Sequence, residues 1–232
     1  MEQNDTLLQS TVFVRWKGEM VMLEKVRKIS MAPYVSGGLL IINILIFLWC
    51  TFGGELLYNV GELSPQKFFE KKEYYRLIFS MFLHEDIGHL VNNMLLLFGL
   101  GAMIEKELGH ITFAVAYFVT GIGGNLGSLI FKIYCGQWNV GSIGASGAVF
   151  GLIGVLLALA FFSGLELPNV TPARMILVVG YSVYSGMDNP GIDNAAHVSG
   201  LVAGILFGAL LCVKIRMKNR DNNVHIGGYH ED

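Results

Sequence analysis

The 232-residue sequence has few charged residues for its length. Charged side chains make up 15% of the chain, against about 25% in an average soluble domain. Apolar residues make up 53%, and the mean hydropathy is +0.53. This number of charged residues is too small to cover the surface of a soluble globular protein. The composition therefore excludes a soluble globular protein. It predicts a polytopic membrane protein.

Other features are scarce too. The net charge is only −2, and there is no strongly basic surface of the kind that binds nucleic acid. The three cysteines, Cys50, Cys135 and Cys212, form neither a disulfide framework nor a CxxC metal pattern. No apolar run opens the chain, so we expect no cleavable signal peptide. Glycine, by contrast, is abundant, with 29 residues, and small residues let membrane helices approach closely.

Six apolar segments approach the length of about 20 residues that a helix needs to cross a bilayer. They are residues 34–52, 86–104, 110–133, 146–163, 171–184 and 192–215, of which the fifth is the shortest. The sequence therefore predicts an all-α membrane protein with a six-helix domain over residues 32–216 and a polar first loop. Residues 1–31 and 217–232 are predicted tails. Short apolar stretches in the first tail leave open an amphipathic helix lying on the membrane or a solvated tail.

The basic residues predict an orientation. With six crossings both termini lie on one side of the membrane. Most of the sixteen lysines and arginines fall on that side, in the two tails and at Lys106 and Arg174. Basic residues favour the cytoplasmic side of a membrane. We therefore expect cytoplasmic termini. No transit peptide or additional span is visible, so the expected location is a bacterial cytoplasmic membrane.

Polar side chains occur inside three of the predicted spans. His89 and Asn93 lie in the second span, Ser146 opens the fourth, and His197 lies early in the sixth. Ionisable residues within a bilayer are costly and commonly functional. Even-numbered spans enter the membrane from the same face, so these groups are predicted to lie at similar depth.

Glycines predict close packing of the helices that carry two of these residues. They are spaced four apart, at Gly200, Gly204 and Gly208 in the sixth span and at Gly147 and Gly151 in the fourth. Such spacing allows helix backbones to come close to contact, which would bring Ser146 within reach of His197. A role in helix packing alone would account for the glycines but not for the buried histidine.

A serine and a histidine in contact permit nucleophilic catalysis, in which the histidine takes the hydroxyl proton. No acidic residue lies inside a span at the right depth, which favours a dyad over a triad. His89 and Asn93 are four residues apart and share a helix face, so with the backbone N–H of Ser146 they could stabilise an oxyanion. Gly144 would permit a tight entry into the fourth span.

Two other kinds of site remain to be weighed. His84, Glu85 and His89 resemble the zinc motif HExxH, but the histidines are five residues apart instead of four. On a helix that spacing rotates them roughly 140° from each other. No third ligand accompanies them, so we expect neither a metal nor another cofactor. The other alternative is a transporter bundle with purely structural histidines.

Three motifs, in this order, resemble those of the rhomboid family of intramembrane serine proteases. They are His84-x4-His89-x3-Asn93, Gly144-Ala145-Ser146-Gly147 and Ala196-His197-x2-Gly200-x3-Gly204. The resemblance covers about residues 33–216. It implies that Ser146 is the nucleophile and His197 the general base, with His89 and Asn93 at the oxyanion positions.

The resemblance also implies supporting roles. His84 matches a structural histidine, Glu105 a structural glutamate at the inner end of the second span, and Phe150 the aromatic ring that packs on the catalytic histidine. Tyr75-Arg76 resembles an aromatic–arginine pair of the first loop. The short fifth span matches an element discussed as a lateral substrate gate.

The implied activity is hydrolysis of peptide bonds in or near transmembrane segments of single-span or multi-span membrane proteins, within the lipid bilayer and without a cofactor. A catalytically silent relative that binds membrane proteins is the alternative. The sequence indicates no oligomeric state.

Overall fold

A computed structural model of the chain describes residues 10–16, 19–25, 32–162, 171–187 and 191–227. The chain divides into two compact units, Met1–Ala32 and Pro33–Asp232.

The N-terminal unit contains a β-hairpin. Strands β1 (Ser10–Trp16) and β2 (Glu19–Lys25) pair antiparallel, with Val12 opposite Leu23. Of the two alternatives left open for this tail, the amphipathic helix is not formed by the described residues. The run from Thr11 to Trp16 is rich in β-branched and aromatic residues, which favour extended backbone.

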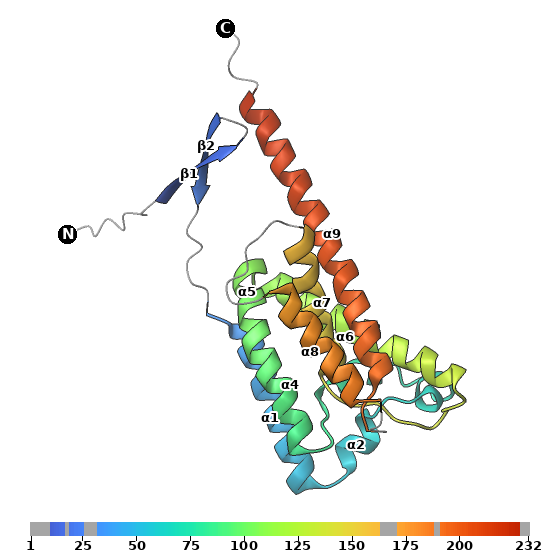
Figure 1. The fold of residues 1–232 in the computed structure, drawn as a ribbon. Coiled ribbons are helices and arrows are strands. Elements are labelled where there is room, and N and C mark those ends of the chain that lie inside the picture. The colour runs from blue at the N-terminus through green and yellow to red at the C-terminus, as the bar shows by residue number, and fades with distance from the viewer. Residues whose placement is uncertain (1–9, 17–18, 26–31, 163–170, 188–190, 228–232) are drawn as a thin grey trace, which may run out of the picture. The chain divides into compact units, whose positions relative to one another are not determined.

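The second unit is helical (Figure 1). It begins with α1 (Tyr34–Gly53), and the first loop then carries α2 (Leu56–Gly61), the π-helical turn η1 (Gln66–Glu70), α3 (Arg76–Phe79) and the 3-10 turn η2 (Ser80–Phe82). A continuous rod follows, made of α4 (Ile87–Leu96), the π-helical turn η3 (Leu97–Gly101) and α5 (Ala102–Leu108). The last four helices are α6 (His110–Tyr134), α7 (Ser146–Phe162), α8 (Pro172–Ser185) and α9 (Asn194–Gly227).

These helices confirm the predicted all-α membrane bundle. Each of the six predicted spans coincides with a helix or, for the second span, with the rod α4–η3–α5. Within the described residues, four helices are long and apolar enough to cross a membrane, and α7 is a shorter apolar helix. α8 has only 14 residues, in line with the short fifth span. α9 continues past the predicted end of the sixth span to Gly227.

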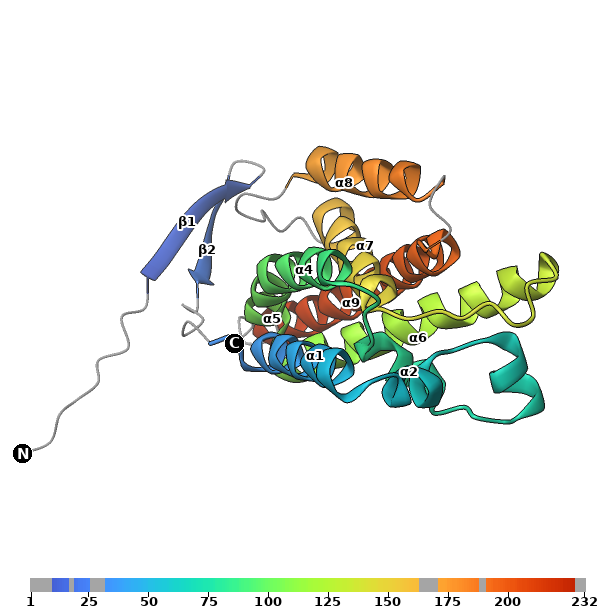
Figure 2. The same cartoon turned by 90° about the horizontal axis from the view of Figure 1, so that it is seen from below.

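α7 lies at the centre of the bundle because it is apolar on all sides. Every residue from Gly147 to Leu159 is buried, and α7 packs against both α6 and α9. Figure 2 shows α6, α7 and α9 together, with α8 at the edge. α8 has one buried residue, Met175, within its described length.

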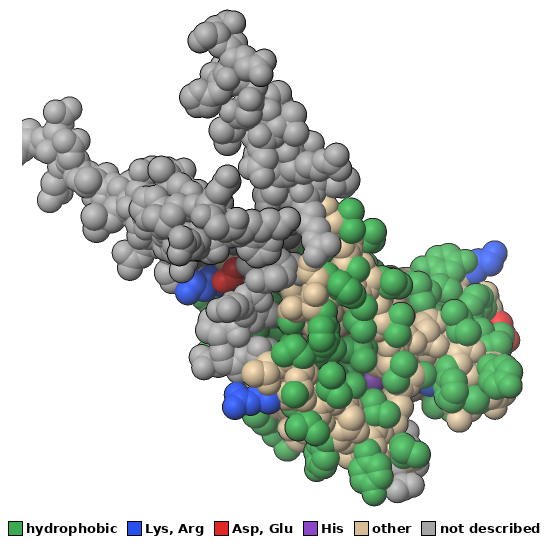
Figure 3. Space-filling model, turned by 45° about the horizontal axis from the view of Figure 1, so that its top comes forward, with side chains coloured by type: hydrophobic (Ala, Val, Ile, Leu, Met, Phe, Trp, Pro, Cys, Tyr) green, Lys and Arg blue, Asp and Glu red, His purple; other side chains and the backbone are tan. Residues whose placement is uncertain are grey.

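The outside of the bundle is apolar, as a surface in contact with lipid requires. Large hydrophobic side chains are exposed along the helices, among them Trp49, Leu95, Ile111, Leu206 and Leu210. On the face that Figure 3 shows, hydrophobic side chains are spread widely over the described residues, with few charged ones between them.

Glu105 joins the rod α4–η3–α5 to the start of α1. Its carboxylate accepts hydrogen bonds from the backbone N–H groups of Val35 and Ser36, both at 2.8 Å, and from the Ser36 hydroxyl. It also contacts His110 Nδ1 at 2.5 Å. The first turn of a helix has unpaired N–H donors, and here a glutamate from another helix satisfies them.

Candidate active site

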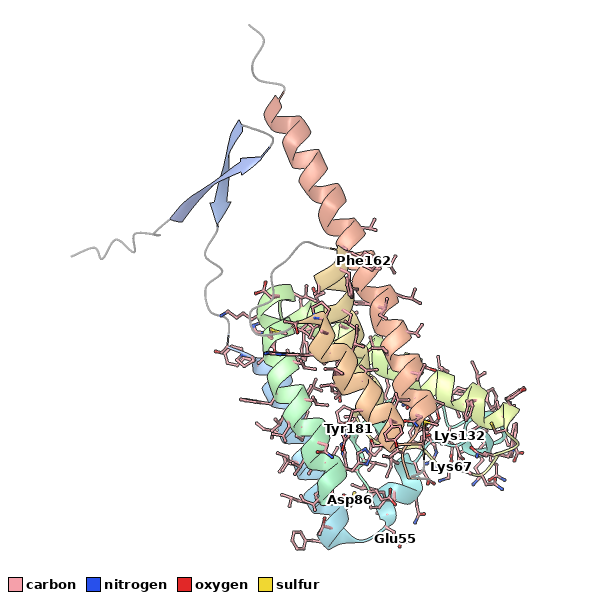
Figure 4. All side chains as sticks on the ribbon, viewed as in Figure 1. Glu55, Lys67, Asp86, Lys132, Phe162 and Tyr181 are labelled. Atoms are coloured by element: carbon pink, nitrogen blue, oxygen red, sulfur yellow. The ribbon has the colours of Figure 1, made fainter. Side chains whose placement is uncertain are left out.

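Three helices begin at the same end of the bundle, and each has a predicted site residue in its first turn. Ser146 is the first residue of α7, and His89 and His197 lie one turn or less into α4 and α9. Figure 4 shows Asp86, just before α4, near one end of the bundle and Phe162, the last residue of α7, toward the other.

Carboxylates cap two of these helices. Asp86 accepts a hydrogen bond of 2.9 Å from the backbone N–H of His89. Asp193 accepts one of 3.0 Å from the N–H of Ala196. Acidic caps are common at helix starts because they satisfy free N–H donors. The caps therefore set where α4 and α9 begin, and with that the positions of His89 and His197.

The two glycine stripes bring α7 and α9 into backbone contact. A Cβ atom added to Gly200 would collide with the carbonyl oxygen of Gly147, and one added to Gly204 would collide with that of Gly151. No larger residue fits at Gly200 or Gly204 without displacing a backbone. Because Gly147 follows Ser146 and Gly200 lies one turn after His197, this contact brings the two helix starts together.

The His197 ring is held by stacking. It lies nearly parallel to the Phe150 ring, with centroids 4.2 Å apart and planes 9° apart. Phe150 is four residues after Ser146, so the two side chains share a face of α7. His197 is buried, and its Nδ1 atom has no hydrogen-bond partner in the described part of the chain. The packing that the resemblance implies for Phe150 is therefore present.

His89 and Ser146 approach each other over Gly144. A Cβ on Gly144 would lie 2.7 Å from His89 Nε2 and 3.7 Å from Ser146 Oγ. Gly144 has φ +123°, a conformation that side chains disfavour. Both the conformation and the close approach of His89 therefore require glycine at this position.

Asn93 is buried on the same helix as His89. Its Nδ2 atom has no hydrogen-bond partner among the described residues. Buried amide groups are usually paired, so a donor held in this way is suited to a group that the chain itself does not supply.

His84 occupies a different place from the one its spacing suggested. It lies before α4 begins, so the rotation calculated for two residues on one helix does not apply. Its ring instead meets the His89 ring edge to face, with centroids 5.1 Å apart. Burial, assisted by the neighbouring His89, lowers the pKa of His84 to about 3. His84 is therefore a neutral ring that packs against His89.

Arg76 and Glu105 lie outside this group. Arg76 is buried in the first loop, where it donates to the carbonyl oxygens of Asn59 and Glu62 at 3.0 and 2.9 Å. Its guanidinium carbon lies 5.5 Å from the centre of the Tyr75 ring. Both residues join segments of the fold, Arg76 within the first loop and Glu105 at the start of α1.

A buried polar cluster beside the site was missed in the sequence. Asp193 and Lys132 form an ion pair of 3.2 Å, and the Asp193 carboxylate also accepts from Ser128 and Ser142 at 2.5 Å each. The prediction that no acidic residue lies inside a span at the right depth overlooked Asp193, which belongs to the predicted sixth span and comes one turn before His197. An Asp directly before an apolar helix is a cap signal, and Lys132 is an ionisable residue within a span.

A cleft of about 1210 Å³ opens next to these residues. It is bordered by the first loop, by the last part of α6 and by residues of the segments 140–143, 186–187 and 191–199, and its lining includes Tyr58, Ile143 and Ala195. Ile143 and Ala195 are close in sequence to Ser146 and His197. The cleft is large enough for a short extended peptide.

The ligand chemistry of a metal centre is missing from the described residues. In that part of the chain no three His, Cys, Asp or Glu side chains are grouped so that they could hold a metal ion. Ser146, His89, Asn93 and His197 instead lie near the starts of α7, α4 and α9, where Asn93 and His197 are buried and Ser146 and His89 are partly exposed.

Comparison with known proteins identifies the family. The Rhomboid domain model matches residues 71–214. RHOMBOID-like protein 4 of Arabidopsis thaliana is 36% identical over 160 residues, which are 68% of this chain and 39% of that protein. The putative rhomboid protease YdcA of Bacillus subtilis is 34% identical over 158 residues, 68% of this chain and 73% of that protein. Rhomboid protease GluP of B. subtilis is 32% identical over 139 residues, 60% of this chain and 26% of that protein.

This chain belongs to the rhomboid family and is a multi-pass membrane protein. The chain spans about half or less of the length of the Arabidopsis relatives that it matches, from 39% to 53%.

Proposed function

We propose that this protein is an intramembrane serine protease, with Ser146 as nucleophile and His197 as general base. The observation that carries the proposal is the contact between the first turns of α7 and α9. Gly147 and Gly200 meet at backbone distance there, and Phe150 stacks on His197 at 4.2 Å. The names of GluP and YdcA, which include the word protease, support the same activity.

In the proposed reaction, the Ser146 oxygen attacks the carbonyl carbon of the scissile peptide bond while His197 takes the hydroxyl proton. His197 then gives that proton to the departing amine, and the acyl group stays on Ser146. A water molecule attacks the acyl-enzyme with His197 again as base. Release of the new carboxyl group restores the serine.

The hydrogen bonds of the nearby Asp193 carboxylate support a dyad over a triad. In a triad, an acidic residue orients the histidine from its Nδ1 side. Here the carboxylate of Asp193 bonds to Ser128, Ser142 and the N–H of Ala196. Stacking on Phe150 takes over the orienting role.

We assign the oxyanion site to Asn93 Nδ2, His89 Nε2 and the backbone N–H of Ser146. Such donors stabilise the charge that develops on the carbonyl oxygen. The support is the buried Asn93 Nδ2, which has no partner in the described part of the chain, and the approach of His89 to the Ser146 hydroxyl over Gly144.

The proposed substrates are single-span or multi-span membrane proteins, cut in or near a transmembrane segment. A helical segment must be extended before its backbone can reach the serine, which favours segments with small or helix-weakening residues. The distribution of basic residues supports cytoplasmic termini, with the site near the opposite face. The proposed location remains the bacterial cytoplasmic membrane expected from the sequence; two of the relatives are from Bacillus subtilis and six are from Arabidopsis thaliana.

The test is cleavage of a fluorescent single-span substrate by the purified protein in liposomes. We expect Ser146→Ala and His197→Ala each to lower turnover by more than about 10³-fold with an unchanged melting temperature. Ser185→Ala, which removes an exposed serine hydroxyl on α8, is the matched control and should cleave normally. Wild-type protein that cleaves no substrate, or full activity in either site variant, would contradict the proposal.

A further inference from the structure

We infer that Asp193 is a positioning residue that fastens the loop before Ser146 to the helix that carries His197. This inference rests on the proposed function, because it assigns Asp193 to the geometry of that dyad. It concerns the cluster formed by Asp193, Lys132, Ser128 and Ser142, which takes no part in the reaction proposed above.

The carboxylate of Asp193 divides its bonds between the two sides of the site. One oxygen accepts from Ser128 and Ser142 at 2.5 Å and lies 3.2 Å from Lys132 Nζ. The other accepts from the backbone N–H of Ala196 at 3.0 Å. The side chains of Asp193 and Lys132 are only 17% and 7% exposed, so the pair is held inside the protein.

On the side of the nucleophile, Ser142 is joined to three parts of the fold. Its backbone exchanges two hydrogen bonds with Leu63 of the first loop, at 2.7 and 3.1 Å. Its hydroxyl contacts Ser128 and Lys132 of α6 as well as Asp193. Lys132 also donates to the carbonyl oxygen of Gly141 at 2.7 Å. Four residues after Ser142 comes Ser146.

On the side of the base, Asp193 is part of the start of α9. Its carbonyl oxygen accepts from the backbone N–H of His197 at 3.2 Å, while its carboxylate caps the same turn. A shift of Asp193 therefore shifts His197. Because one carboxylate also holds Ser142, the separation of the two dyad residues depends on it.

The expected consequence is kinetic. Misplacement of reacting groups by about 1 Å can cost roughly 10² in rate. Simple removal of Asp193 is a poor test, since it leaves the buried Lys132 unpaired and could prevent folding. The chain offers a cleaner comparison in two serines that bind the same carboxylate oxygen.

Ser142→Ala and Ser128→Ala each remove one hydroxyl bond to Asp193, but only Ser142 belongs to the loop that leads to Ser146. We expect Ser142→Ala to lower kcat about tenfold or more with little change in KM. Ser128→Ala should lower kcat no more than about twofold at a similar loss of melting temperature. Ser142→Thr, which keeps the hydroxyl, should recover most of kcat. Equal losses of kcat in the two alanine variants, or no recovery with threonine, would overturn the inference.

A second arm uses Asp193→Asn combined with Lys132→Met, which removes both charges and keeps a capping side chain at the start of α9. The rate of backbone hydrogen exchange then shows whether Asp193 holds the loop before Ser146 to the start of α9, and this measurement does not require an active enzyme. We expect faster exchange in 141–146 and in the first turn of α9 and unchanged exchange in α1. Unchanged exchange around Ser146 and His197 would overturn the inference.

The two hypotheses fail differently. If the wild type is inactive and Ser146 does not react with a fluorophosphonate, the proposed function is wrong. Hydrogen exchange alone then decides whether Asp193 joins the loop before Ser146 to α9. If the wild type is active and the two serine variants behave alike, the proposed function stands and the role of Asp193 is wrong.

Discussion

At the scale of single residues, the site combines unpaired polar groups with close apolar packing. Among the described residues, neither the buried amide donor of Asn93 nor Nδ1 of His197 has a hydrogen-bond partner, and Phe150 holds the His197 ring by stacking. Buried polar atoms without partners cost free energy. Asn93 and His197 lie on two of the three helices that carry the proposed site, where such atoms can receive polar atoms of a substrate.

The oxyanion assignment leads to a prediction about His89 and Asn93. Removal of one oxyanion donor typically costs about 10²–10³ in rate. We expect a smaller loss for His89→Ala or Asn93→Ala, because the Ser146 N–H remains, and a larger loss for the double variant. Turnover per folded molecule and melting temperature are to be measured together. Normal turnover in variants that melt early would make both residues structural.

His84 permits a prediction about pH and stability. Burial lowers its pKa to about 3, whereas an unfolded histidine titrates near 6.5. Between these values the unfolded chain binds a proton that the folded chain does not, so stability falls as the pH falls. His84→Phe removes this proton uptake and keeps an aromatic ring against His89.

The measurement for His84 is the melting temperature at pH 7 and pH 4.5. The wild type should lose more stability over this interval than His84→Phe. The same loss in both proteins would show that His84 does not stay neutral in the fold.

At the scale of elements, the helices differ in how firmly they are held. α7 is buried from Gly147 to Leu159, whereas α8 has only Met175 buried within its described length. An element with few buried contacts opens at a low free-energy cost. α8 is therefore the helix best suited to move aside for a substrate.

Loosening α8 should raise turnover if it limits substrate entry. We expect Met175→Ala to increase cleavage of a single-span substrate a few-fold while lowering the melting temperature, since large-to-small core changes cost about 2–5 kcal/mol in soluble proteins. Ile104→Ala, a buried change in α5, is the matched control and should only lower the melting temperature. Equal or lower turnover in Met175→Ala would argue against entry beside α8.

At the scale of the whole molecule, the six proposed crossings would place both termini on one side of the membrane and the site near the other. Cys135 is exposed just after α6, whereas Cys50 and Cys212 are buried. An impermeant maleimide added from outside should therefore label the wild type at Cys135 and should not label Cys135→Ser.

The other face can be tested with Asp232→Cys in the Cys135→Ser background. Its label should appear only when the reagent reaches the cytoplasmic side. Labelling of both positions from the same side would contradict six crossings and would separate Ser146 from His197.

Much of this protein could be predicted from the sequence. Hydrophobic length determines where helices cross a bilayer, so the starts of all six spans were found. Glycines four apart predicted the contact of α7 with α9, because only small residues allow it. The N-terminal hairpin was not predicted, because its short apolar stretches suggested only an amphipathic helix or a solvated tail.

Tertiary structure decided what depends on contacts distant in sequence. Spacing alone misplaced His84, because a helical rotation was applied to a residue that lies before α4 begins. Asp193, Ser142 and Lys132 come from separate segments, and only the fold brings their charges and hydroxyls together. Local patterns determine helices and their apolar faces, whereas a buried ion pair exists only where packing excludes water around both partners.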